Sequence, residues 1–242
     1  MDGTLSDGAN WWGLAAFALL VAGFGLAFFF LTILPQRRNA TGLRALSQRR
    51  GWRIEKASGS VLKGQGSTLY TDVHPKDDAG WRCRITFFAN GNRQIRSTEF
   101  ADPTLPAPGG MIVIGPQLEP DAARIAGQFL GQMAGPLGSL AMRALLGDQL
   151  DGVEELRPVE GLAGETVLAT AGMDAAAVQQ RVTALIRQFC ATYPDEKSFP
   201  ILIWGAQGCR VRLRDDASQP AKLEAFVDHA LAVCAALRQP PA

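Results

Sequence analysis

The chain has 242 residues, of which 47% are apolar, and its formal net charge is only +1. This apolar content is ordinary for a globular protein, and about 190 residues can bury one good core or two small ones. The four cysteines are widely spaced and form no CxxC pair, so we expect free thiols in a reducing cytoplasm. Three pairings would be possible only if the domain lay outside the cell.

The first predicted element is the apolar segment at residues 11–34, WWGLAAFALLVAGFGLAFFFLTIL, which carries no charge. Its 24 residues would reach roughly 36 Å as a helix, enough to cross a hydrocarbon core of about 30 Å. Indole rings favour the headgroup layer, and arginines after a span stop its transfer. The expected membrane anchors are Trp11, Trp12, Arg37 and Arg38. The sequence therefore predicts a transmembrane helix over residues 11–35.

A cleaved signal peptide is the main alternative to a permanent span. A signal peptide needs a basic start and an apolar stretch of about 7–15 residues, whereas residues 1–10 carry two acids and no base. Residues 1–36 have a net charge of −2, residues 37–56 of +6 and residues 57–242 of −3. The positive-inside rule then predicts a protein of the cell inner membrane, with its N-terminus outside and its C-terminal domain in the cytoplasm. The mild acidity of that domain argues against nucleic acid as a partner.

A short basic juxtamembrane helix is expected over residues 36–51, with Asn39 as its N-terminal cap and Gly51 as its stop. Its positive side chains are Arg44, Arg49 and Arg50. Two interpretations stay open for this helix. It either lies on anionic lipid or serves as a linker whose arginines only set the topology.

After Gly51 the apolar pattern changes from the helical period to the alternation of a strand. Residues 52–118 are expected to form an antiparallel meander of about five strands. Apolar and polar side chains alternate most clearly over residues 81–87, and the Asn-Gly-Asn turn that follows predicts a hairpin partner over residues 94–100. Residues 111–114 read as a short buried strand.

A glycine-rich connecting helix is expected over residues 119–150. Its glycines form one face that lets another backbone approach closely. They are Gly127, Gly131, Gly135 and Gly138. Polar residues and Pro136 argue against a second membrane span. The helix therefore either packs on the sheet with a kink at Pro136 or contacts lipid or a partner.

The C-terminal lobe is predicted over residues 151–238, followed by a tail at residues 239–242. Its elements follow the order strand, helix, strand, strand, helix, which is typical of an antiparallel sheet with two helices on one face. Asp174 is expected to cap the first helix, and Pro220 lies near the start of the second.

The sequence contains no recognisable catalytic, cofactor or metal motif. His74 and His229 are far apart and lack the spacing of metal ligands. The GQGST segment at residues 64–68 has two glycines of a phosphate loop but lacks the rest of the motif. We therefore expect no enzyme activity, no bound cofactor and no metal.

Arginines recur along the expected strands. Arg82, Arg84, Arg93 and Arg96 are expected to project together from the hairpin, and Arg210, Arg212 and Arg214 alternate on a later strand. Paired arginines on a sheet face suit phosphates or acidic peptides. The possible anion or lipid contacts are Arg82, Arg84 and Arg96, but the pattern is more typical of solvated faces.

The sequence as a whole predicts the α+β class, with a single N-terminal transmembrane helix, an antiparallel β meander and a βαββα-type lobe. Small residues line one side of the predicted span, where another helix can pack closely. They are Ala15, Ala18, Ala22 and Gly25. We expect a non-catalytic interaction protein, an accessory or scaffold subunit of a membrane complex, whose partner is another membrane protein or a second copy. The alternative is a membrane-tethered domain that binds or hydrolyses a lipid headgroup or phosphorylated ligand.

Overall fold

The computed structural model describes residues 34–60, 67–77, 80–90, 93–117, 156–159 and 165–239, together with residues 16, 17, 19–21 and 24. The chain divides into two compact units, residues 1–46 and 47–242. Among the residues just named, no helix is both long and apolar enough for a membrane span. Most of the span predicted at residues 11–35 lies outside the described residues, as does the connecting helix at residues 119–150.

Helix α2 (Leu34–Arg50) corrects the predicted start of the juxtamembrane helix. The helix is already formed at Leu34, so Asn39 lies inside it and is not its cap. Pro35 fits this earlier start, because proline is tolerated in the first helical turn, where backbone N–H groups have no intrahelical acceptor. Gly51 follows the helix with a φ of 65°, the left-handed conformation expected of a glycine stop.

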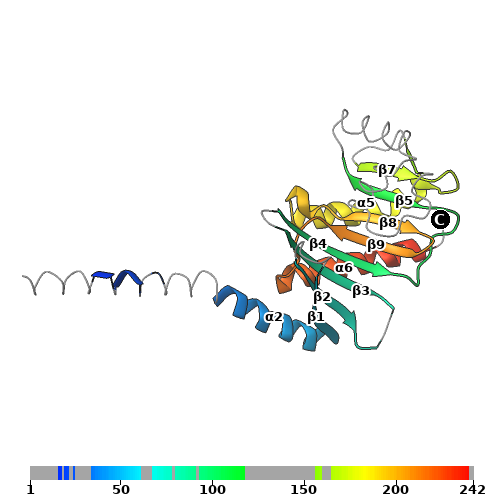
Figure 1. The fold of residues 1–242 in the computed structure, drawn as a ribbon. Helices are drawn as coiled ribbons and strands as arrows, with labels where there is room; N and C mark the ends of the chain where they lie inside the picture. Colours follow the sequence, from blue (N-terminus) through cyan, green and yellow to red (C-terminus); the bar gives the residue numbers. More distant parts are fainter. Residues whose placement is uncertain are drawn as a thin grey trace, which may run out of the picture. The chain divides into compact units, whose positions relative to one another are not determined.

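The second unit is built on one antiparallel sheet, and Figure 1 shows most of its strands by label. The described strands are β1 (Trp52–Ser60), β2 (Ser67–Pro75), β3 (Arg82–Asn90), β4 (Arg93–Asp102), β5 (Ile112–Pro116), β6 (Arg157–Pro158), β7 (Glu165–Ala169), β8 (Ile201–Gly205) and β9 (Gly208–Leu213). Their order across the sheet is β1-β2-β3-β4-β9-β8-β5-β7-β6. The α+β class with a large antiparallel sheet is thus confirmed.

Strands expected in separate lobes lie in the same sheet, because β4 pairs with β9 over the register Phe100↔Val211. Strand β5 does not continue the meander as expected; it pairs with β7 and β8 instead. The loop after β4 passes the β8–β9 hairpin and is bound to it by two hydrogen bonds. Trp204 Nε1 donates to the Leu105 carbonyl at 3.0 Å, and Ala107 N donates to the Gly205 carbonyl at 2.9 Å.

The C-terminal part contains two helices: α5 (Ala175–Thr192) follows β7, and α6 (Pro220–Arg238) follows β9. A short 3-10 helix, η3 (Glu196–Ser198), lies between α5 and β8. The Asp174 carboxylate accepts a hydrogen bond from Ala177 N at 3.0 Å, which confirms the predicted cap of α5. The two helices pack against each other; α6 contacts β4 and β9, and α5 contacts β7. Figure 1 shows both helices running beside the sheet.

The strand register separates the two faces of the sheet. We call the side covered by α5 and α6 the helix face; it carries buried side chains such as Cys83, Phe100 and Val211, which stand side by side on β3, β4 and β9. Apolar side chains of the helices are equally buried, among them Ile186 and Phe226. Successive side chains of a strand point to opposite faces, so the intervening residues lie on the other side, which we call the open face.

The open face differs between the two halves of the sheet. Around β5 and β8 it carries a second small core, in which Val113, Ile201 and Ile203 surround the fully buried Leu156. On β1–β4 and β9 it carries two rows of mostly charged residues, and Tyr70, Phe88 and Ile95 lie further along the same strands. This charged half is where the arginines of the sheet collect.

Candidate functional site

Two rows of charged side chains cross the open face from strand to strand. The register pairs Arg53 with His74, Arg82 with Ala101, and Ala101 with Arg210. We call Arg53, His74, Arg82 and Arg210 the basic row. The next row, two residues further along each strand, alternates in sign, and we call it the mixed row. It consists of Glu55, Asp72, Arg84, Glu99 and Arg212.

The centre of the mixed row is a bidentate ion pair between β3 and β2. Arg84 donates from Nε to Asp72 Oδ1 at 2.7 Å and from Nη2 to Asp72 Oδ2 at 2.8 Å. These hydrogen bonds hold the pKa of Asp72 below its usual value, and they raise the pKa of Arg84. The Arg84 guanidinium also lies 5.0 Å from the centroid of the Tyr70 ring. Side chains of the neighbouring strand β2 therefore hold the Arg84 guanidinium in place.

Carboxylates neutralise the positive charges of the basic row less completely than those of the mixed row. His74 Nε2 lies 3.5 Å from Glu55 Oε1, and Arg210 Nη1 lies 3.8 Å from Glu99 Oε1. Arg53 and Arg82 are exposed, and neither forms a hydrogen bond or ion pair with another described residue. Together the two rows hold five arginines against three carboxylates. The charged half of the open face thus has a positive excess within a nearly neutral domain.

The predicted arginine cluster is only partly present. Arg82 and Arg84 share the open face, but Arg96 pairs in register with Phe87 and therefore lies on the helix face. There its guanidinium lies 5.3 Å from the Phe87 ring centroid and 3.7 Å from Asp216 Oδ2. The expectation that Arg96 joins Arg82 and Arg84 is wrong, because adjacent strand positions alternate between faces.

Arg49 and Arg50, two of the predicted lipid contacts, have acidic partners on α6. Arg49 Nη2 lies 2.5 Å from Glu224 Oε2, and Arg50 pairs with Asp228. These contacts connect the end of α2 to the C-terminal helix. Arg44 is exposed.

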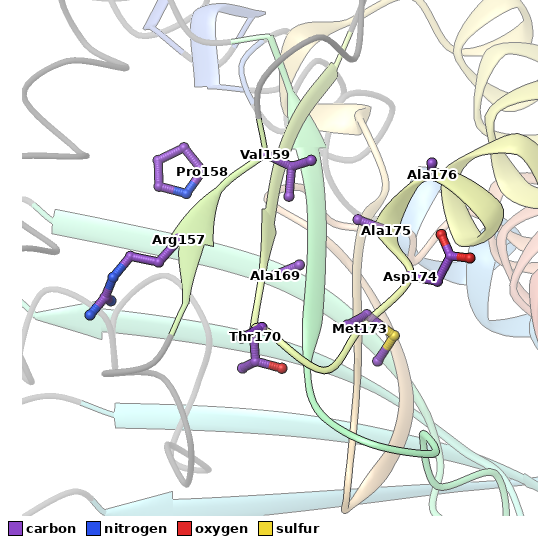
Figure 2. A pocket seen from close by; sticks show the side chains of 10 residues that line it. Arg157, Pro158, Val159, Ala169, Thr170, Met173, Asp174, Ala175 and Ala176 are labelled. Atoms are coloured by element: carbon purple, nitrogen blue, oxygen red, sulfur yellow. The ribbon is translucent and has the colours of Figure 1, made fainter.

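A pocket of about 850 Å³ lies at the start of α5 (Figure 2). Figure 2 shows Arg157 and Asp174 on opposite sides of it, with Thr170 and Met173 between. The polar groups there have structural partners, since Asp174 caps α5 and Thr170 Oγ1 accepts a hydrogen bond from Met111 N at 3.0 Å. The side chains of the pocket include no nucleophile paired with a base.

The nearest approach to a catalytic arrangement is formed by Ser198, Lys222 and Asp215. Lys222 Nζ donates to Ser198 Oγ at 2.9 Å and also to Asp215 Oδ2. Although burial alone would raise the pKa of Asp215, the hydrogen bond from Lys222 shifts that pKa downward overall. The Lys222 amine is bound to the Asp215 carboxylate, and Ser198 is only 1% exposed, so its hydroxyl is closed to a substrate. The cluster therefore connects η3 to α6 and does not form a nucleophile–base pair.

The cysteines of the described residues are free and mostly structural. Burial raises the pKa of the Cys83 thiol, and a hydrogen bond with Cys234 together with burial raises that of Cys209. A reactive cysteine needs a lowered pKa and access to solvent. Among the described residues, no group of three or more His, Cys, Asp or Glu side chains is arranged to bind a metal ion.

Several predicted contacts cannot be placed. The glycines Gly127 to Gly138, the small residues of the predicted span and most of the GQGST segment lie outside the described residues. Conversely, the sequence did not predict that Arg53 and His74 lie beside Arg82 and Arg210, which follows from the register of the strands. The alternation of charged residues within β1 and within β9 indicated only that the charged side chains of each strand lie on one face. Comparisons of this chain with models of protein families, with curated proteins and with solved structures found no match.

Proposed function

We propose that this chain is a single-pass, membrane-anchored, non-catalytic interaction protein, an accessory or scaffold subunit of a membrane complex. Residues 11–35 would cross the inner membrane, with the folded domain in the cytoplasm. The described residues between 16 and 24 are helical, and their large apolar side chains are 54–75% exposed. Such side chains are stable in lipid and costly in water.

The observation that carries the interaction function is the charged half of the open face. The helix face provides the core of the domain, whereas Arg53 and Arg82 on the opposite side form no hydrogen bond or ion pair with a described residue. An antiparallel sheet tolerates one solvated face. Arg53, Arg82 and Arg210 each lie two strands from the next, so their charges add up on one surface that attracts a partner of opposite charge.

Site-specific photocrosslinking in native membranes tests this function. With benzoylphenylalanine at Thr86, which lies on the open face beside the mixed row, we expect one discrete crosslinked adduct of defined mass. The same probe at Gln188, an exposed residue of α5, serves as the control and should give no such adduct. An absent adduct at Thr86, or equal adducts at both positions, would argue against an interaction surface on the open face.

A groove beside β1 favours the second candidate function, binding of a lipid headgroup or phosphorylated ligand. It has a volume of about 560 Å³, and its lining includes Trp52, Trp81, Leu231 and the cations Arg49 and Lys76. The Arg50 guanidinium lies 5.3 Å from the Trp52 ring centroid. Apolar side chains next to cations suit an anionic amphiphile, although Asp77 also lines the groove.

Native mass spectrometry of the protein released from detergent tests the groove. If the groove holds phospholipid, the wild type should retain about one molecule per chain, and Lys76→Glu should lose it because the charge reversal repels the phosphate. Lys197→Glu, an equal charge change at an exposed site on η3, should retain the lipid. Lipid-free wild-type protein would leave the interaction function as the better explanation of the domain.

A further inference from the structure

The basic row narrows the kind of partner that the open face can accept. We infer that it binds an extended acidic segment of a partner protein, with carboxylates paired to Arg53 and Arg82. This inference rests on the proposed interaction function and adds the chemistry of the partner. Three features carry it: the positive excess of the face, the two arginines that form no ion pair with a described residue, and the arrangement of acids around them.

The geometry of the row matches a linear ligand. Arg53 and Arg82 lie two strands apart on β1 and β3, which places their backbones roughly 10 Å from each other. Side chains on the same side of an extended peptide recur about every 7 Å, so two glutamates can each reach one arginine. Further along the row, Ala101 has a small side chain and leaves space for a chain that continues toward Arg210.

Electrostatics favour a narrow ligand over an anionic bilayer. The carboxylates of the mixed row stand about 7 Å from the basic row along the strands, and Glu55 is 61% exposed. A bilayer surface would cover both rows and bring its phosphates against Glu55, Asp72 and Glu99. A single peptide can lie along the basic row alone and avoid these like-charge contacts.

Fluorescence anisotropy with a labelled ten-residue oligoglutamate peptide tests the inference, using the full-length protein in phosphatidylcholine nanodiscs. We expect salt-sensitive binding that Arg53→Glu with Arg82→Glu weakens by about tenfold or more. Lys56→Glu with Lys197→Glu makes the same change in net charge at exposed sites off the row, since Lys56 lies on the helix face of β1. That control should change the Kd by less than about twofold. Arg53→Lys with Arg82→Lys should keep most of the binding, and circular dichroism should show all variants folded.

Other outcomes would overturn the acidic-segment inference. Equal losses in both charge-reversed variants would show attraction to net charge alone. Full displacement of the peptide by millimolar inorganic phosphate would indicate a site for small anions, and binding of phosphatidylserine vesicles that depends on Arg53 and Arg82 would indicate a membrane contact. If the Thr86 adduct persists in Arg53→Glu with Arg82→Glu, the acidic partner is wrong but the interaction function stands. If the wild type gives no adduct, the interaction function itself fails.

Discussion

Gly208→Ala should lower the free energy of unfolding by about 3 kcal/mol, because two costs combine at this position. Gly208 has a φ of 106°, which a residue with a Cβ adopts only with strain. The added Cβ would also clash with the Asp102 carbonyl oxygen and lie 2.6 Å from Pro103 Cα. Both atoms belong to backbone that cannot rotate away, so the β4–β9 pairing has to shift.

Gly115→Ala provides a matched control for this substitution. Gly115 lies in β5, has no positive φ, and its added Cβ would meet nothing within 4 Å. We expect a change within about 0.5 kcal/mol. Urea unfolding of both variants in detergent, followed by circular dichroism, measures the difference. A loss of less than about 1 kcal/mol in Gly208→Ala would contradict the tight contact between the β8–β9 turn and the end of β4.

The second large effect is a loss of stability in acid caused by His229. The imidazole is 9% exposed, its Nε2 has no hydrogen-bond partner among the described residues, and its ring centroid lies 4.9 Å from that of Phe189. Burial lowers the pKa of His229 to about 4 from its ordinary 6.5. Between these values the unfolded chain binds a proton that the folded protein excludes. Stability is therefore full above pH 6.5 and falls as the pH drops toward 4, by about 3 kcal/mol.

His229→Phe should remove this acid sensitivity, because an apolar ring of similar shape has no proton to bind. Unfolding free energies of the wild type and the variant, measured from pH 7 to pH 4, should diverge by about 3 kcal/mol in favour of the variant. The carboxyls of Asp72 and Asp215, whose pKa values are lowered, weaken both proteins equally in acid and cancel in the difference. Parallel curves for the two proteins would show that water reaches the imidazole in the folded state.

Local patterns predicted most of the strands and helices, because alternation and capping act over a few residues. The strand containing Cys83, the α5 cap at Asp174 and the stop at Gly51 were all predicted from their immediate neighbours. The pairing of β4 with β9 was not predicted. About a hundred residues separate the two strands, and no local sequence pattern identifies which strand pairs with β4.

The candidate site depends on such distant pairings. Arg93 and Arg96 differ by an odd number of positions, so one strand cannot present both on the same face. Counting positions within β4 would have shown that Arg93 and Arg96 cannot belong to one cluster on a single face. By contrast, the meeting of Arg82 with Arg210 requires the register of β3, β4 and β9 together, and only the folded sheet provides it.

The pairing of β4 with β9 also dictates an order of events during synthesis. The meander leaves the ribosome early, yet the edge of β4 stays unpaired until Gly208–Leu213 has been translated. Closing so long a loop is slow, and an unpaired strand edge is a template for association with other chains. Nascent or truncated chains that end before residue 208 would therefore carry an incomplete sheet with an unpaired edge, and translation of β9 and α6 removes this risk of aggregation.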